Sequence, residues 1–95
     1  MEISNNKKEF RFEGIFENGE KATLEYRWLK GSMVLMHTLV PASLRGTGAG
    51  SKLVNYVLEY AKAQNLKIIV YCPFVAKYLQ THPEYNDLID EAHRK

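Results

Sequence analysis

The sequence predicts a single domain of mixed α/β (α+β) class with the element order β-β-β-α-β-α-α. In the first 40 residues apolar and polar side chains alternate with a period of two, which is typical of strands. The period then becomes helical, apart from one short β-branched run. With 95 residues, of which 45% are hydrophobic, the chain can build one core but not two. We expect strands at 10–17, 22–28, 33–40 and 66–71, and helices at 48–65, from 73 onward and at 83–92.

Two alternating segments flank Asn18-Gly19, which is a strong signal for a β-hairpin. A two-residue loop would pair Phe12 with Glu25 and place the apolar rows on opposite faces. A three-residue loop pairs Phe12 with Leu24 and keeps the apolar rows together. Because register follows the buried face, we prefer the three-residue loop, with Gly19 in the left-handed conformation.

The third predicted strand is apolar on both sides, which indicates a central strand covered on both faces. The fourth strand follows a strand–helix crossover, so we expect it to run parallel to the third. The predicted sheet is therefore mixed, with an antiparallel N-terminal meander and one parallel pair. Simple alternation places Met33, Leu35 and Leu39 on one face of the third strand and Val34, Met36 and Val40 on the other.

A glycine-rich turn joins this strand to the long helix, with three glycines in the five residues 46–50. Glycines allow a ligand close to the backbone, and the N–H groups at a helix N-terminus carry a partial positive charge. Such a turn can cradle a phosphate or pyrophosphate group, and Arg45 adds a permanent cation. The spacing fits neither a P-loop nor a dinucleotide fingerprint, and a loop that only reverses the chain is the plainer alternative. The predicted cradle comprises Arg45, Gly46, Thr47, Gly48, Ala49, Gly50 and Ser51.

The charge balance and cysteine content exclude several classes of protein. A net charge of +2 without a basic stripe argues against nucleic acid as a partner. No stretch of 18 apolar residues exists, so we expect no membrane segment. A single cysteine, Cys72, indicates a reducing cytoplasm, and the His and Cys spacing matches no metal site. The sequence does not define the oligomeric state, for which a monomer is the working expectation.

Arg45-Gly46-Thr47-Gly48-Ala49-Gly50 resembles the R/Q-x-x-G-x-G/A pattern of the GCN5-related N-acetyltransferases, the GNAT superfamily. A closer resemblance is to its small members with a YjdJ-like N-acetyltransferase domain. Four blocks carry this resemblance along nearly the whole chain, residues 1–95: His37-Thr38-Leu39-Val40-Pro41, Leu44-Arg45-Gly46-Thr47-Gly48, Cys72-Pro73-Phe74-Val75 and His82-Pro83-Glu84-Tyr85.

The resemblance implies a compact GNAT-like fold that binds acetyl-CoA in a cleft splayed between the third and fourth strands. The glycine turn would hold the pyrophosphate, and the pantetheine arm would pair with backbone near Leu39 and Val40. Cys72 and Phe74 would also contact the cofactor. The implied reaction transfers an acetyl group to an amine, either a small molecule or a protein lysine or N-terminus.

Three residues are candidates for this chemistry. His37 is the one histidine inside a predicted strand and is of a type suited to a general base. Cys72 precedes a predicted helix N-terminus, which favours a thiolate nucleophile, although it could line the cofactor site or simply be buried. The resemblance implies Tyr78 as a candidate acid for the departing thiolate, and each of the three residues could instead be structural. A non-catalytic acyl-CoA-binding module, acting as a sensor or partner subunit, is the alternative function.

Overall fold

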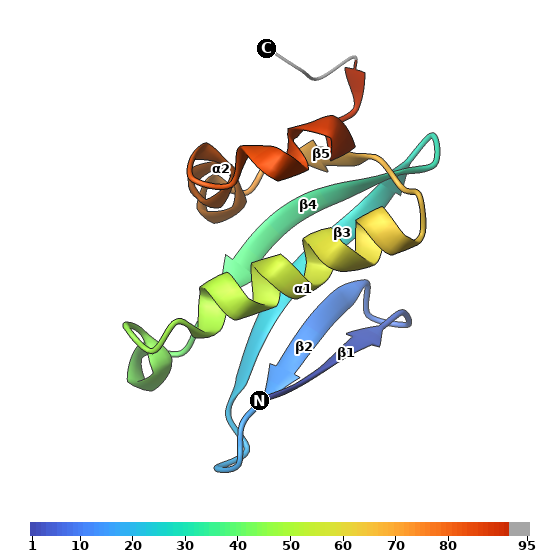
Figure 1. Cartoon of the computed structure of the whole chain (residues 1–95). Coiled ribbons are helices and arrows are strands. Elements are labelled where there is room, and N and C mark those ends of the chain that lie inside the picture. Colours follow the sequence, from blue (N-terminus) through green and yellow to red (C-terminus); the bar gives the residue numbers. More distant parts are fainter. Residues whose placement is uncertain (92–95) are drawn as a thin grey trace.

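The protein is an α+β domain in which two helices pack on one mixed sheet (Figure 1). The computed structural model describes residues 1–91. Within these residues, neither helix has the length and apolar character needed to cross a membrane. The strands are β1 (Glu2–Asn6), β2 (Arg11–Ile15), β3 (Lys21–Leu29), β4 (Ser32–Leu39) and β5 (Ile68–Val70); the helices are α1 (Ala49–Ala63) and α2 (Pro73–Gln80), with 3-10 turns η1 (Ala42–Leu44) and η2 (Pro83–Leu88).

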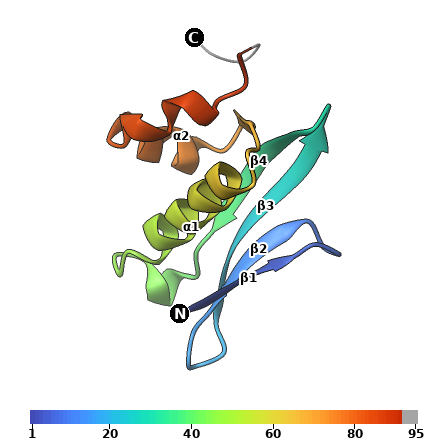
Figure 2. The ribbon, with the colours of Figure 1, turned by 45° about the vertical axis from the view of Figure 1, so that its right-hand side comes forward.

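The strands follow one another across the sheet in chain order, β1-β2-β3-β4-β5. Every neighbouring pair is antiparallel except β4 and β5, which confirms the predicted meander and parallel pair. Both helices lie on the same face of the sheet (Figure 2). We expected β4 to be covered on both faces, but no helix of residues 1–91 covers the second face. Val34 and Ile69 are nevertheless buried on that face.

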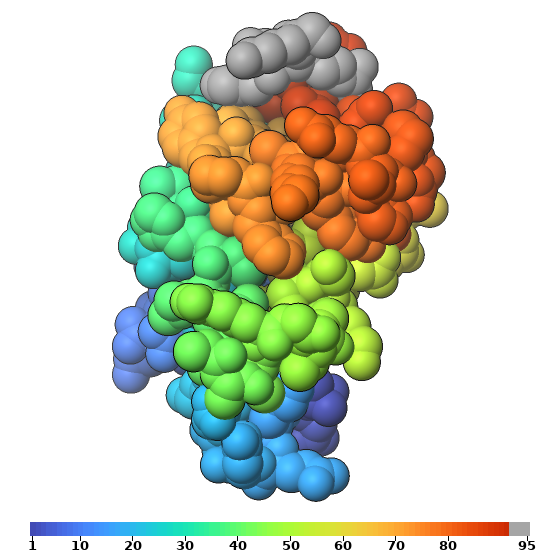
Figure 3. Space-filling model, turned by 90° about the vertical axis from the view of Figure 1, so that its left-hand side faces the viewer, coloured from blue at the N-terminus to red at the C-terminus, as the bar shows by residue number. Residues whose placement is uncertain are grey.

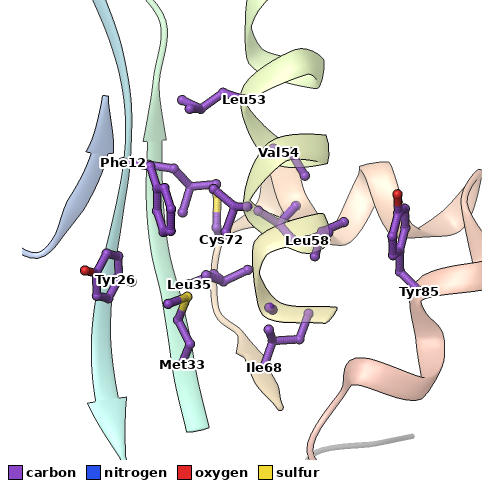
Figure 4. Packing of buried hydrophobic residues seen from close by; sticks show 14 of the residues in the cluster. Phe12, Tyr26, Met33, Leu35, Leu53, Val54, Leu58, Ile68, Cys72 and Tyr85 are labelled. Atoms are coloured by element: carbon purple, nitrogen blue, oxygen red, sulfur yellow. The ribbon is translucent and has the colours of Figure 1, made fainter. Parts of the chain in front are cut away.

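The hydrophobic core fills the space between the sheet and the two helices (Figure 4). α1 is a 15-residue amphipathic helix, and its apolar side faces the sheet, as its sequence period predicts. Tyr26, which is 1% exposed, satisfies its hydroxyl by donating a hydrogen bond to Asn5 Oδ1 at 2.7 Å. The largest fully buried side chains are Phe12, Leu24, Tyr26, Met33, Leu35, Val54, Val57, Leu53, Leu58, Ile68, Ile69 and Val75.

The β2–β3 hairpin has the predicted three-residue loop. Phe12 pairs with Leu24, and the Phe16 N–H donates to the Glu20 carbonyl at 2.9 Å. Gly19 has φ of 84°, the left-handed conformation that the loop requires. The register therefore keeps Phe12, Leu24 and their neighbours on the core face.

Two parts of the fold differ from the prediction. β1 is an additional edge strand that pairs antiparallel with β2, and its polar sequence EISNN gave no strand signal. The last predicted helix, 83–92, is the shorter 3-10 turn η2, and residue 92 lies outside the described residues.

A β-bulge interrupts β4 and reverses the orientation of its second half. Tyr26 pairs with Leu35 and Glu25 pairs with His37, which leaves Met36 as the extra residue. Simple alternation is therefore wrong beyond this point. Leu39 is 64% exposed rather than facing the core with Leu35, whereas Val40 packs against the core.

Candidate functional site

The glycine-rich loop between β4 and α1 forms one wall of a surface pocket of about 340 Å³. Thr47, Leu39 and Cys72 do not line this pocket, whereas the other predicted cofactor-binding residues do. α2 closes the pocket with a single side chain, Phe74. The lining residues are Val40, Leu44, Arg45, Gly46, Gly48, Ala49, Gly50, Ser51 and Phe74.

Two glycines give the loop its shape. Gly46 and Gly48 have φ of 83° and 84°, a backbone conformation that other residues rarely adopt. A Cβ atom added to either glycine would meet no heavy atom within 4 Å. Both positions therefore face open space, which leaves the backbone accessible to a ligand.

The pocket has the electrostatic character of an anion site. Gly48, the N-cap of α1, makes no side-chain cap bond, and the first turn of the helix contains no acidic residue. Arg45 is exposed on the pocket wall, and its Nε donates to the Val40 carbonyl at 3.4 Å. The partial positive charge of the helix N-terminus and the guanidinium thus act on the same space.

The Thr47 side chain stabilises the loop by hydrogen bonds to its backbone. Its hydroxyl donates to the Leu44 carbonyl at 2.5 Å and accepts a hydrogen bond from the Ala49 N–H at 3.3 Å. These bonds link η1 to the first residue of α1. The side chain therefore positions the cradle and does not line it.

β4 has an unpaired edge next to this pocket. The β4–β5 ladder ends at the pair Leu35–Val70, and the N–H groups of Tyr71 and Cys72 both donate to the Leu35 carbonyl. Within residues 1–91, no strand pairs with this side of β4 beyond Leu35. The predicted splay between the two parallel strands is therefore present, and it leads toward Val40 in the pocket wall.

The register shows which backbone groups face the splay. The Tyr26 N–H donates to the Phe10 carbonyl of the preceding segment. The backbone N–H and C=O of Tyr26 therefore point away from β4, and those of Glu25 point toward β4. Glu25 thus forms the hydrogen-bonded pair with His37. The next residue along β4, Thr38, directs its N–H and C=O into the splay.

The Cys72 thiol lies at the same place, on the core side of the sheet. Cys72 is the N-cap of α2 and is only 2% exposed. Its Sγ lies 3.2 Å from Thr38 Oγ1, which is within hydrogen-bond distance. His37 is exposed and, as the neighbour of Thr38 in a strand, points to the opposite face. The structure therefore brings Cys72 to Thr38 and not to His37.

Tyr78 lies at the other end of α2 from Cys72. Its hydroxyl accepts a hydrogen bond from Asn55 Nδ2 of α1 at 3.1 Å. Its ring stacks on His82, with ring centroids 3.9 Å apart and planes within 4° of each other. This position belongs to a second recess between α1 and α2, which the sequence did not reveal.

The comparisons with known proteins identify the family of the chain. The sequence model of the family described as GCN5-related N-acetyl-transferase matches residues 11–88. A solution NMR structure of a GCN5-like candidate N-acetyltransferase from Staphylococcus aureus superposes with a TM-score of 0.71 and 34% identity, covering 94% of this chain and 87% of that one.

Curated relatives are more distant. Protein NATD1 from Danio rerio is 29% identical over 94 residues, which cover 94% of this chain and 84% of the relative. Protein NATD1 from Xenopus tropicalis is 29% identical over 65 residues, which cover 67% of this chain and 60% of the relative. Protein NATD1 from Homo sapiens is 31% identical over 65 residues, which cover 67% of this chain and 58% of the relative. This chain thus spans about three fifths of the length of those two relatives.

The family match covers both the glycine cradle and the splayed strand pair, and the structural match covers nearly the whole fold. The chain therefore belongs to the GCN5-related N-acetyltransferase family.

Proposed function

We propose that this protein is an acetyl-CoA-dependent N-acetyltransferase that transfers an acetyl group to an amine. The observation that carries the proposal is the open glycine pocket at the N-terminus of α1, whose wall includes Val40, the residue directly after β4 and its unpaired edge. Family membership supports the same reaction class. The acceptor is an amine of a small molecule, or of a protein lysine or N-terminus.

The cradle fits the pyrophosphate of CoA. The N–H groups of Gly46, Gly48, Gly50 and Ser51 and the Arg45 guanidinium supply donors and positive charge, while Gly46 and Gly48 leave room for the phosphates. The pantetheine arm then runs along the splay and pairs with the backbone of Thr38 and Val40, because the backbone groups of Leu39, predicted for this role, point to Thr23 of β3. This path ends close to Thr38 and Cys72.

The cofactor supplies the acetyl group as a thioester. In direct transfer, the amine nitrogen forms a bond to the carbonyl carbon, the carbon–sulfur bond breaks, and a base takes the amine proton. We assign the base to His37, and the backbone N–H groups of β4 that face the splay stabilise the oxyanion.

Cys72 offers a second route. Its thiol can accept the acetyl group as a thioester and pass it to the amine, with CoA released as the thiol. Thr38 holds the thiol at the edge of the splay for this step. The role of Tyr78 as the acid for the leaving thiolate stays a prediction, and its contact with Asn55 suits the adjacent recess better.

The alternative is an acyl-CoA-binding module without efficient transfer. Two observations favour it: Cys72 is only 2% exposed, and no helix of residues 1–91 covers the second face of the sheet to shape an acceptor pocket.

Mass spectrometry of reaction mixtures with a panel of amines separates the two functions. The enzyme produces an N-acetylated amine and free CoA, and turnover falls with His37→Ala or Cys72→Ser but not with Lys62→Gln, an exposed control on α1. Tight acetyl-CoA binding with no product for any amine would support the module. Failure of the wild type to bind acetyl-CoA would remove both.

A further inference from the structure

The splay between β4 and β5 has a closed inner end. The two strands pair as far as Leu35 and Val70, and the Leu35 carbonyl then accepts both the Tyr71 N–H at 3.0 Å and the Cys72 N–H at 3.1 Å. A chain that enters the splay from the glycine loop can therefore run no further than Thr38 and Cys72. Figure 3 shows the side of the molecule on which this loop lies, with residues 41–50 in green below residues 70–80 in orange.

A pair of side chains closes the core side of the splay at this end. Thr38 of β4 and Cys72, the N-cap of α2, meet there with Oγ1 and Sγ 3.2 Å apart. Leu35, Leu58 and Val75 are fully buried in the core cluster to which Cys72 also belongs (Figure 4). A group at the end of the splay therefore cannot pass into the core without displacing the Thr38–Cys72 pair.

The opposite side of the splay is open. His37 and Leu39 point to the second face of the sheet, where Leu39 is 64% exposed. No helix of residues 1–91 covers that face. An apolar chain that turns to this side stays in water and gains nothing from burial. It also lies on the side of His37, the base that we assign, where the amine must approach.

We infer that Thr38 and Cys72 set the length of the acyl chain that the protein accepts, with room for a short acyl group in front of the pair and none behind it. The inference rests on the proposed function, because it places the thioester at the inner end of the splay. It makes the two residues determinants of donor specificity. Each carbon beyond a short acyl group has to displace the pair or turn into the path of the amine.

Equilibrium binding by calorimetry tests the limit without any need for turnover. The probes are CoA, acetyl-CoA, butyryl-CoA and hexanoyl-CoA. In wild type the affinity should not rise from acetyl-CoA to the two longer thioesters. A chain that entered an apolar pocket would instead gain about fourfold in affinity for each CH₂ group that it buries.

Variants at the two positions separate side-chain volume from hydrogen bonding. Thr38→Ala removes the hydroxyl and the methyl group, so butyryl-CoA should bind about fourfold more tightly than acetyl-CoA, as expected for one further buried CH₂ group. Thr38→Val is the matched control, because it loses the hydroxyl but keeps the volume, and it should keep the wild-type order of affinities. Cys72→Ala should relax the limit as Thr38→Ala does, whereas Cys72→Ser, which is close in size, should not. The affinity for CoA, which carries no acyl group, should be the same in all four variants.

The possible failures can be told apart. A wild-type affinity that rises about fourfold per CH₂ group from acetyl-CoA to hexanoyl-CoA would overturn the inference. An unchanged order of affinities in both Thr38→Ala and Cys72→Ala would overturn it too, and so would loss of CoA binding in both, which would make the pair a support of the fold only. Each of these results leaves CoA bound by the wild type and the glycine cradle standing. A wild type that binds none of the probes would overturn the inference together with the proposed function.

Discussion

Thr38 Oγ1 lies 3.2 Å from Cys72 Sγ, and the bulge at Met36 is what brings the two side chains together. Without the extra residue, strict alternation would turn Thr38 away from the core face and place Leu39 there instead. The bulge also directs the backbone of Thr38 into the splay. One inserted residue thus aligns a hydroxyl, a thiol and free backbone groups at the same point.

Removing this hydroxyl should weaken the fold measurably. Thr38→Val keeps the shape of the side chain but leaves the thiol without its partner, so the free energy of unfolding should fall by about 1 kcal/mol. Urea unfolding measures the change, and Thr38→Ser should recover most of it. Equal stability of Thr38→Val and wild type would show that the contact contributes nothing.

Gly50 controls how closely α2 approaches the cradle. A Cβ atom added there would lie 2.6 Å from Phe74 Cζ, so the ring must move. Because Phe74 is 41% exposed, it can swing outward, and we expect Gly50→Ala to cost less than about 1 kcal/mol in stability while opening the pocket wall. Affinity for acetyl-CoA should fall several-fold. Phe74→Leu in the same background relieves the clash, and a full loss of folding in Gly50→Ala would contradict this account.

Tyr85 links η2 to α1 by a hydrogen bond, and its ionisation should make the free energy of unfolding fall at alkaline pH. Its hydroxyl donates to Glu59 Oε2 at 2.5 Å, and this bond, together with burial, raises the pKa of Tyr85 from 10.0 to about 12. The unfolded chain therefore ionises first, so the stabilisation is complete below about pH 10 and is lost as pH rises toward about 12.

Tyr85→Phe isolates this effect from the other tyrosines. The variant should lose about 1.5 kcal/mol of stability at neutral pH and show a smaller further loss above about pH 10 than wild type does. Guanidinium unfolding across this range measures both. Parallel pH profiles for the two proteins would contradict the assignment.

The sequence was sufficient for the parts of the fold that bury a regular apolar pattern. The hairpin register followed from Phe12 and Leu24, and the turn at the start of α1, where the structure has a surface pocket, followed from Gly46, Gly48 and Gly50. β1 could not be predicted, because an edge strand is held by its ladder with β2 and its one large apolar residue, Ile3, sets no period.

The bulge escaped prediction for a related reason. Met36 is apolar like its neighbours and no glycine marks the site, so the sequence gives no sign that alternation stops there. The prediction therefore exchanged the faces of Leu39 and Val40 and missed Thr38, although the two polar residues His37 and Thr38 in a mostly apolar strand were the available signal. The place of Tyr78 also depends on a tertiary contact, since Asn55 lies on α1.

The central claim is that the glycine loop binds acetyl-CoA, and thermal unfolding with and without saturating ligand tests it most directly. At a ligand concentration of about 100 times Kd, binding adds about 2.7 kcal/mol, which for a domain of this size raises Tm by about 10–20 °C. Gly48→Glu should abolish the shift, because a carboxylate then occupies the open space of the cradle.

Gly31→Glu is the matched control. Gly31 has the same φ of 84° with nothing within 4 Å of an added Cβ, but it lies in the β3–β4 turn at the opposite end of β4. This variant should show the same strain and charge change as Gly48→Glu while keeping the full shift with acetyl-CoA. A wild-type Tm that acetyl-CoA does not change, or a shift that survives Gly48→Glu, would contradict the account.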